Sequence, residues 1–230
     1  MDGNSHIRLA SYNMRKCIGL DRRRKPGRII DVLNSLQADV VALQEADRRL
    51  GERHAALPAR MIEDETDFRS VEIENSGPSL GWHGNAVLVR KELSSSGADR
   101  FYLPGTEPRG AVRVQVSGFQ IVATHLGLLR SDRRSQLTAI RQQLKGSPTP
   151  TVIVGDFNEW AQTRGLEPIS EEFTIHSPGR SFHAARPIVA LDRVAVGRDI
   201  ELLNAGVGET ATARIASDHL PIWADIKIAV

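Results

Sequence analysis

The stretch TVIVGDFNEW, from Thr151 to Trp160, has the composition of a buried strand in its first half and of a polar site in its second half. Its opening β-branched residues favour a strand. Gly155 and Asp156 then suit a turn, which would explain the end of the strand without any function. Asp156 and Asn158, however, place an acid and an amide two positions apart, and such groups can hold a phosphoryl oxygen or orient a water molecule. The other strand ends of the chain decide between these two interpretations.

Strand-like runs recur along the chain, several of them with alternating apolar and polar residues. They are Ile7–Tyr12, Val40–Gln44, Ala86–Arg90, Ala111–Val116, Phe119–Thr124, Thr151–Val154, Val189–Val196 and Pro221–Ile228. The short turn between Val116 and Phe119 predicts an antiparallel hairpin. Helical patterns cover Pro26–Gln37, which opens on proline, and Ser131–Lys145, for which Ser131 is the expected N-cap. Hairpins mixed with helical crossovers predict an α/β protein with mixed sheets.

The composition is typical of a globular domain, with 40% hydrophobic and 25% charged residues, and we expect a single domain over residues 1–230. Glu63–Pro78 and Ser94–Pro108 are the loosest stretches, and we expect both to be surface loops. The single cysteine, Cys17, excludes an internal disulfide framework and suits a reducing compartment. No segment has the apolar length of a signal peptide or a membrane span, so we expect a cytoplasmic protein without membrane insertion. A chain of this size without exposed heptads is expected to be a monomer.

The overall charge is nearly balanced, with 30 Lys and Arg against 28 Asp and Glu, and therefore does not by itself indicate nucleic acid binding. A basic cluster, Arg22-Arg23-Arg24-Lys25 followed by Arg28, lies close to the N-terminus. Such a run is usually a solvated face, and the alternative is a patch that binds an acidic substrate.

Polar residues with catalytic or metal-binding capacity lie at six strand ends. They are Asn13, Glu45, His125, Asp156 with Asn158, Asp192, and the Asp218-His219 pair that enters the last strand. Each one alone could be turn chemistry or a satisfied structural residue. Glu and His are not preferred turn formers, however, and strand ends that meet at one edge of a sheet hold such groups together on rigid supports. The set therefore predicts one polar site at a sheet edge.

The acidic members of this set suit a divalent cation. Glu45, Asp156 and Asp218 are hard oxygen donors of the kind that Mg²⁺ and Mn²⁺ prefer. No group of Cys and His residues has the spacing of a structural zinc site. Together these donors predict a Mg²⁺ or Mn²⁺ site.

The remaining members suit proton transfer and phosphate binding. Asp192 and His219 could form an acid–imidazole pair in which the carboxylate fixes the ring tautomer. His125 offers a second imidazole for a developing oxyanion, and Asn13 and Asn158 can hold a phosphoryl oxygen without adding charge. This is the equipment for metal-assisted attack of water on a phosphoester.

The same residues lie in segments that resemble a known superfamily. The segments are LASYNMRKC (9–17), ADVVALQEAD (38–47), WHGNAVLVR (82–90), EPRGAVRV (107–114), IVATHLGL (121–128), VIVGDFNEW (152–160), LDRVAV (191–196) and SDHLPI (217–222). Their order resembles that of the endonuclease/exonuclease/phosphatase superfamily, which includes deoxyribonuclease-like nucleases, inositol polyphosphate phosphatases and sphingomyelinases. The chain looks most like its small bacterial metal-dependent hydrolases. This resemblance implies a four-layered α/β sandwich, with two mixed β-sheets packed face to face, helices outside, and a site at one edge.

The resemblance also implies a role for each matched position. Glu45 resembles the principal metal ligand, with Asn13 beside it, and Asp218 resembles a second carboxylate of the metal site. The metal implied is Mg²⁺ or Mn²⁺.

The catalytic positions match as well. Asp156 and Asn158 resemble the pair that positions the attacking water and the phosphate. His219 resembles the general base or phosphate-contacting imidazole, with Asp192 as its orienting partner. His125 resembles the imidazole that assists the leaving oxygen. The two histidines could exchange the roles of acid and base.

Two further residues are candidates for substrate binding. Asn85 and Arg109 lie in segments that resemble those of the bacterial members, and Arg109 could clamp a phosphate oxygen or form an ordinary salt bridge. The chain departs from the resemblance after Asn13, where Met14-Arg15-Lys16-Cys17 makes the mouth of the expected site more basic.

We therefore expect a divalent-metal-dependent phosphoesterase that hydrolyses a phosphodiester. Nucleic acid is one substrate class, favoured by the Arg22–Arg28 cluster, although an aromatic content of 5% offers little for base stacking. The alternative is a lipid or small-molecule phosphoester. A non-catalytic binding module on the same scaffold is a third hypothesis, but it predicts loss of catalytic residues, and the expected ones are present.

Overall fold

A computed structural model describes residues 6–48, 51–73 and 77–229 of the chain. The strands are β1 (Ile7–Asn13), β2 (Val40–Gln44), β3 (Phe68–Ser70), β4 (Ala86–Arg90), β5 (Ser95–Leu103), β6 (Arg109–Val116), β7 (Phe119–His125), β8 (Thr151–Asp156), β9 (Phe173–His176), β10 (Asp192–Gly197), β11 (Ile200–Val207) and β12 (Ile222–Ile228). The helices are α1 (Pro26–Leu36), α2 (Ala59–Glu65), α3 (Arg130–Leu144) and α4 (Ala213–Ala216), with a 3-10 turn at Arg15–Cys17.

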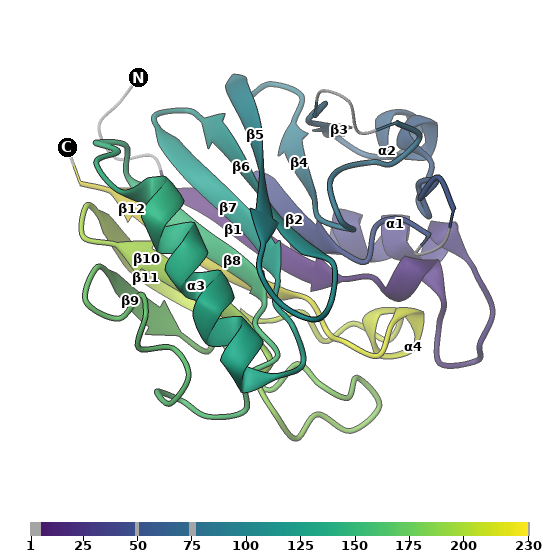
Figure 1. Cartoon of the computed structure of the whole chain (residues 1–230). Coiled ribbons are helices and arrows are strands. Elements are labelled where there is room, and N and C mark those ends of the chain that lie inside the picture. Colours follow the sequence, from purple (N-terminus) through teal and green to yellow (C-terminus); the bar gives the residue numbers. More distant parts are fainter. Residues whose placement is uncertain (1–5, 49–50, 74–76, 230) are drawn as a thin grey trace.

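The strands form two six-stranded sheets (Figure 1). The first has the order β11-β12-β1-β2-β4-β3 and the second β5-β6-β7-β8-β10-β9. Each sheet has one parallel pair, β1 with β2 and β7 with β8, and its other pairs are antiparallel. The prediction of mixed sheets is confirmed, and so is the hairpin between β6 and β7.

The side chains of β8 show why the two sheets pack face to face. Val152 and Val154 belong to the apolar cluster between the sheets, whereas Ile153 belongs to the cluster that α3 covers. A strand that is apolar on both faces must be buried on both sides. Helices α1 and α2 pack on the outer face of the first sheet through a third cluster. The result is the expected four-layered α/β sandwich, in which α3 crosses the outer face of the second sheet (Figure 1).

Helix α3 begins at Arg130, so the expected N-cap at Ser131 is wrong. Leu129 occupies the N-cap position, and it makes no capping hydrogen bond through its side chain. Contacts from elsewhere in the chain hold the first turn instead. The carboxylate of Asp132 accepts hydrogen bonds from the amide and the hydroxyl of Thr106, at 2.8 and 2.7 Å, and Arg133 bonds Glu159. Tertiary partners have replaced the local cap.

The expected loop at Ser94–Pro108 is also wrong, because most of it is the edge strand β5. This strand pairs with β6 through a register shift between Ser96 and Ala98, and much of it is exposed. Residues 74–76 of the other expected loop, Glu63–Pro78, lie outside the described residues, and its described part contains the end of α2 and strand β3. The run Val189–Val196 becomes a strand only from Asp192 onward. None of the described helices has the length and apolar character needed to span a membrane.

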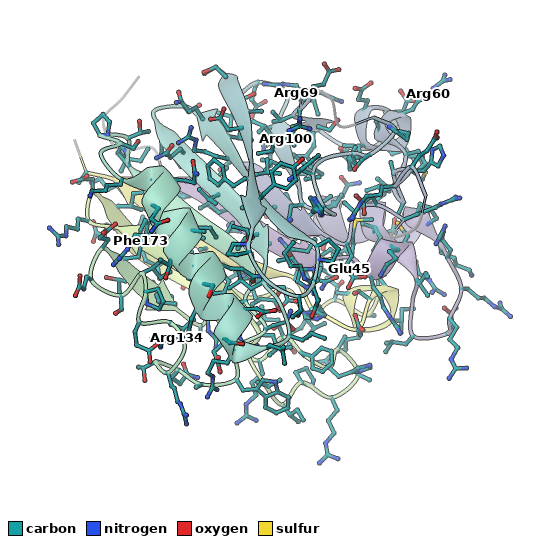
Figure 2. The ribbon with its side chains drawn as sticks, viewed as in Figure 1. Glu45, Arg60, Arg69, Arg100, Arg134 and Phe173 are labelled. Carbon is teal, nitrogen blue, oxygen red and sulfur yellow. The ribbon has the colours of Figure 1, made fainter. Side chains whose placement is uncertain are left out.

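The topology brings the polar strand ends to one edge of the sandwich. In the first sheet, Asn13 at the end of β1 pairs in register with Gln44 at the end of β2. In the second sheet, His125 at the end of β7 lies opposite Asp156 on β8, which in turn lies opposite Asp192 at the start of β10. Glu45, directly after β2, lies toward the end of the sandwich that carries α4, whereas Arg69 on β3 lies at the other end (Figures 1 and 2).

Candidate active site

The carboxylate of Asp156 is the centre of the polar site. It is buried, with a relative exposure of 1%. The side-chain amide of Asn13 donates to its Oδ2 at 3.0 Å, and the backbone amide of Asn158 donates to its Oδ1 at 2.9 Å. The Nε2 atoms of His125 and His219 lie 3.4 and 3.6 Å from the same Oδ2. One buried acid therefore joins both sheets and lies beside two amides and two imidazoles.

Asp192 and His219 form the expected acid–imidazole pair. The Nδ1 atom of His219 lies 2.9 Å from Oδ2 of Asp192, and the hydroxyl of Ser181 donates to that same oxygen. The other oxygen, Oδ1, is buried without a hydrogen-bond partner among the described residues. One donor atom from each of Asp156, Asp192 and His219 lies within 4.8 Å of the others. An unpartnered carboxylate oxygen beside a second carboxylate suits a cation or another group that carries positive charge.

The two imidazoles have opposite electrostatic environments. Burial lowers the pKa of His219, but the carboxylates of Asp192 and Asp156 outweigh it and raise that pKa to about 10. Burial lowers the pKa of His125 to about 3, even though Asp156 acts in the opposite direction. A cation beside these carboxylates would act against their effect on His219. The environment of His219 therefore makes its ring the more basic of the two.

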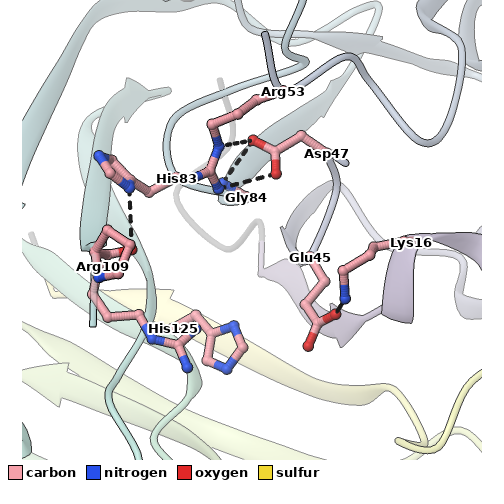
Figure 3. Close-up of a pocket in the computed structure, with 9 residues that line it drawn as sticks. Lys16, Glu45, Asp47, Arg53, His83, Gly84, Arg109 and His125 are labelled. Atoms are coloured by element: carbon pink, nitrogen blue, oxygen red, sulfur yellow. Dashed lines mark hydrogen bonds and ion pairs between the residues drawn. The ribbon is translucent and has the colours of Figure 1, made fainter. Parts of the chain in front are cut away.

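Glu45 lines a small pocket beside this cluster (Figure 3). The pocket has a volume of about 70 Å³, and its lining residues are Lys16, Glu45, Asp47, Arg53, His83, Gly84, Pro108, Arg109 and His125. Glu45 has a left-handed backbone, with φ of 52°, directly after β2. This conformation is uncommon for a residue other than glycine and is typical of functional positions.

Two basic side chains pair with the acids expected to bind metal. The Nζ atom of Lys16 forms an ion pair with the carboxylate of Glu45, and Nε of Arg15 lies 3.3 Å from Asp218. Both basic residues are in the turn after β1, where Arg15, Lys16 and Cys17 have φ values of 45°, 56° and 61°. The amide of Lys16 also donates to the carbonyl of Glu45 at 3.1 Å. The acids thus attract positive charge where a divalent cation is expected, so the donor set fits Mg²⁺ or Mn²⁺.

The two expected substrate-binding residues differ in position. Arg109 lines the pocket next to His125, donates to Glu107 at 2.6 Å, and keeps a buried Nε without a hydrogen-bond partner among the described residues (Figure 3). Asn85 is fully buried, and its amide donates to the carbonyls of Gly110 and Trp82 at 2.9 and 3.3 Å. Arg109 can therefore reach a ligand, whereas Asn85 fixes the backbone beside it.

Asp47 is a site residue that sequence reasoning missed. It is 2% exposed, pairs with Arg53 through two contacts of 3.1 Å, and accepts the amide of Gly84 at 3.0 Å. The sequence offered one signal for Asp47, because it is an acidic residue two positions after Glu45 in the same segment. Ser181 and Ser217 were missed as well, although Ser217 directly precedes the Asp218-His219 pair. Ser217 donates to the carbonyl of Asn13 at 2.6 Å.

Glu159 is buried directly beyond the site and binds two arginines. Its carboxylate forms ion pairs with Arg130 at 2.6 Å and with Arg133 at 2.7 Å. These two ion pairs join the loop after β8 to the start of α3. Burial acts to raise the pKa of Glu159, but Arg130, the amide of Ala161 and Arg133 lower it to about 2.

We predict that Glu159→Gln lowers the free energy of unfolding by about 3–5 kcal/mol at pH 7, because Arg133 would remain buried without its counter-charge. A carboxylate with a lowered pKa stabilises the fold above its unfolded pKa of about 4.3, and this contribution disappears as the pH falls through about 2. The difference between wild type and variant should therefore shrink between these two pH values. Urea unfolding followed by circular dichroism measures it.

The matched control is Glu209→Gln, which removes an exposed pair with Arg214 of the same 2.6 Å length. We expect it to change stability by at most about 1 kcal/mol. Equal losses in the free energy of unfolding for the two variants would show that the buried Glu159 ion pairs stabilise the fold no more than an exposed pair does.

Comparisons with known proteins agree with this fold. The model of the endonuclease/exonuclease/phosphatase family matches residues 10–219. An uncharacterized protein of Escherichia coli, YbhP, is 27% identical over 226 residues, covering 86% of this chain and 87% of its own length. An endonuclease/exonuclease/phosphatase from Beutenbergia cavernae has a similar structure, with a TM-score of 0.75 and 21% identity over 98% of this chain and 72% of its own. TDP2 of D. rerio, solved with a single-strand DNA product, gives a TM-score of 0.71 and 16% identity over 97% of this chain and 99% of its own.

Proposed function

Because the chain belongs to the endonuclease/exonuclease/phosphatase family, we propose that it is a divalent-metal-dependent phosphoesterase that hydrolyses a phosphodiester by attack of water. The observation that carries this proposal is the buried Asp156 carboxylate, which contacts the amides of Asn13 and Asn158 and faces the imidazoles of His125 and His219. Amides, imidazoles and a carboxylate around one point are the groups that orient a water, hold a phosphate and transfer protons.

Glu45 would hold the cation, with Asn13 next to it and Asp218 as a further carboxylate. Mg²⁺ and Mn²⁺ are the ions of choice, because the donors are hard oxygens. When bound, such an ion supplies positive charge against the negative charge that builds up on the phosphate oxygens. The ion pairs of Lys16 with Glu45 and of Arg15 with Asp218 support this placement, since both acids already face cations.

The chain's own side chains would carry the protons. As the bond from the water oxygen to phosphorus forms, the bond to the leaving oxygen breaks, so the water loses a proton and the leaving oxygen gains one. Asp156 and Asn158 would orient the water and the phosphate. His219, held by Asp192 through Nδ1, presents Nε2 toward Asp156, and His125 presents its own Nε2 to the same carboxylate. These two imidazoles would divide the two proton transfers between them.

Two classes of substrate fit this site. Nucleic acid is supported by the basic turn after β1 and by the likeness to the TDP2 fold, which was solved with a DNA product. A lipid or small-molecule phosphoester is the second class. Arg109 and His125 both line the pocket beside Glu45, so a phosphate of either class would meet them there.

The test is hydrolysis of bis-(p-nitrophenyl) phosphate beside p-nitrophenyl phosphate, single-stranded RNA, single-stranded DNA and duplex DNA, each with Mg²⁺ or Mn²⁺. Cleavage of the diester faster than the monoester supports the proposal. Salt then separates the substrate classes, because binding to a polyanion weakens steeply with added salt and binding to a single phosphate does not. Absence of cleavage on all substrates would contradict the proposal and favour a binding module.

Lys16 provides a prediction that does not depend on activity. Lys16→Gln should tighten the binding of Mn²⁺ about three- to tenfold, because the ammonium group that pairs with Glu45 competes with the ion. Isothermal titration calorimetry without substrate measures this. Arg22→Gln is the control, since it removes a charge from the same loop without contacting Glu45. Equal or weaker binding in Lys16→Gln would argue against Glu45 as a ligand.

A further inference from the structure

The exposed large apolar side chains are concentrated at the active-site edge. The described residues include seven of them, namely Tyr102, Leu128, Leu129, Trp160, Ile188, Leu203 and Ile215. Tyr102 lies near the end of β5, opposite the start of β6 that carries Arg109. Leu203, on β11, is the one that lies away from this edge. Single exposed apolar residues are ordinary, but such a concentration around one polar site indicates a surface that contacts something apolar.

Five of these residues form what we call the apolar rim. Its members are Leu128 (66% exposed), Leu129 (53%), Trp160 (62%), Ile188 (60%) and Ile215 (47%). Leu128 and Leu129 follow His125 at the end of β7, and Trp160 follows Asn158 at the end of β8. Ile188 precedes Asp192, and Ile215 lies on α4 just before Asp218. Every rim residue therefore lies within five residues of a candidate catalytic or metal-binding side chain.

Hydrogen bonds join the first two loops of the rim. Arg130, next to Leu129, binds Glu159, next to Trp160, through contacts of 2.9 and 2.6 Å. The amide of Phe157 then donates to the carbonyl of Leu191 at 2.9 Å, which connects the Trp160 loop to the segment that carries Ile188.

Two more contacts complete the sequence of loops. The amide of Ala184 donates to the carbonyl of Asp218 at 2.7 Å, which connects the segment of Ile188 to that of Ile215. The amide of Leu20 donates to the carbonyl of Ile215 at 3.0 Å, and α4 lies beside the loop that follows β1 (Figure 1). The rim is thus one connected set of loops, joined by backbone hydrogen bonds and by the half-buried ion pair of Arg130 with Glu159.

The loop that follows β1 carries positive charge. Arg22, Arg23 and Arg24 are exposed and form no ion pair within the described residues. Arg180 and Arg186, in the segment that carries Ile188, are also exposed. Apolar side chains and free arginines on adjoining loops match the two features of an anionic lipid surface, namely its acyl boundary and its phosphate groups.

We propose that this edge docks on the surface of an anionic lipid bilayer, with the apolar rim in the headgroup boundary and the arginines on lipid phosphates. Nucleic acid fits the rim less well, because four of its five members are aliphatic and cannot stack on bases. Trp160 suits the membrane interface, where indole rings concentrate. Docking would bring the active-site edge to phosphoesters at that surface. That consequence rests on the proposed function, whereas the docking proposal is independent of it.

The test is flotation of the full chain with vesicles of phosphatidylcholine alone and with vesicles in which one third of the lipid is phosphatidylglycerol. We expect binding to the anionic vesicles and at least about tenfold weaker binding by the double variant Leu128→Ser/Leu129→Ser, and by Trp160→Ala. Leu203→Ser is the matched control, since it removes an equally apolar exposed side chain away from the edge, and it should bind like the wild type. Added salt should weaken binding, because the arginines contribute to it.

Hydrolysis of the soluble bis-(p-nitrophenyl) phosphate separates this inference from the proposed function. The rim variants should retain wild-type rates on it, since their side chains are exposed and none belongs to the proposed catalytic or metal-binding set. Failure of the wild type to float with anionic vesicles would overturn docking, and so would equal loss of binding in Leu203→Ser. Weaker binding of the rim variants to single-stranded RNA, without any vesicle binding, would overturn it in favour of nucleic acid. Vesicle binding without any hydrolysis would leave docking standing and remove the proposed function.

Discussion

Replacing Asp156 by Asn should lower the rate of diester hydrolysis by at least about a thousandfold. The carboxylate contacts both candidate imidazoles and two amides, so loss of its charge alters every group around the reacting phosphate at once. Asn has the same shape, but its amide nitrogen would meet the donor of Asn13 wherever it replaced Oδ2. Steady-state rates on bis-(p-nitrophenyl) phosphate at saturating Mn²⁺ measure the effect.

The control for this variant is Asp99→Asn, which removes an exposed carboxylate on β5 that pairs with Arg113. Its rate should equal that of the wild type. Thermal unfolding of both variants separates a catalytic effect from misfolding. A folded Asp156→Asn variant with more than about a tenth of the wild-type rate would contradict the central place given to this carboxylate.

Replacing His219 by Gln should lower kcat by about a hundredfold to ten-thousandfold, the usual contribution of a positioned acid or base. Asp192→Asn should produce a loss of similar order, because the ring would lose the partner that fixes its tautomer through Nδ1. The double variant should be scarcely slower than His219→Gln alone, since Asp192 would act only through that ring. Rates of the four proteins form a double-mutant cycle.

His176→Gln, on the edge strand β9, is the control for loss of an imidazole, and its rate should not change. Multiplicative losses in the double variant would mean that Asp192 acts independently of His219. Its orphaned Oδ1 would then be the first atom to consider for that independent role.

The strands that carry the site could be predicted from the sequence because their signals are local. β2 and β4 have the bounds expected from their apolar runs. The polar residues that end β1, β7 and β8, and the one directly after β2, could be recognised by type. Phe157, a large aromatic residue between two polar site residues, lies in the core. β5 was missed because its exposed face is polar and its register shift interrupts the alternation.

The partners of the site residues could not be predicted, because they depend on contacts between distant parts of the chain. Asn13 and Asp156 are 143 residues apart, and Asn13 and Ser217 are 204 apart. Glu159 resembles an ordinary turn acid in sequence, and only the packing of α3 beside it turns it into a buried partner of two arginines. The pairing of Lys16 with Glu45 depends in the same way on the left-handed turn after β1.

The measurement that tests the account most directly is hydrolysis of bis-(p-nitrophenyl) phosphate by the purified wild type, with Glu45→Gln beside it. Each protein is assayed as purified, after EDTA, and after restoration of Mg²⁺ or Mn²⁺. The account predicts that the wild type loses its activity with EDTA and regains it with the ion, and that Glu45→Gln is inactive or needs far more metal. Hydrolysis that continues undiminished in EDTA, or that Glu45→Gln retains at the same metal concentration, would contradict it.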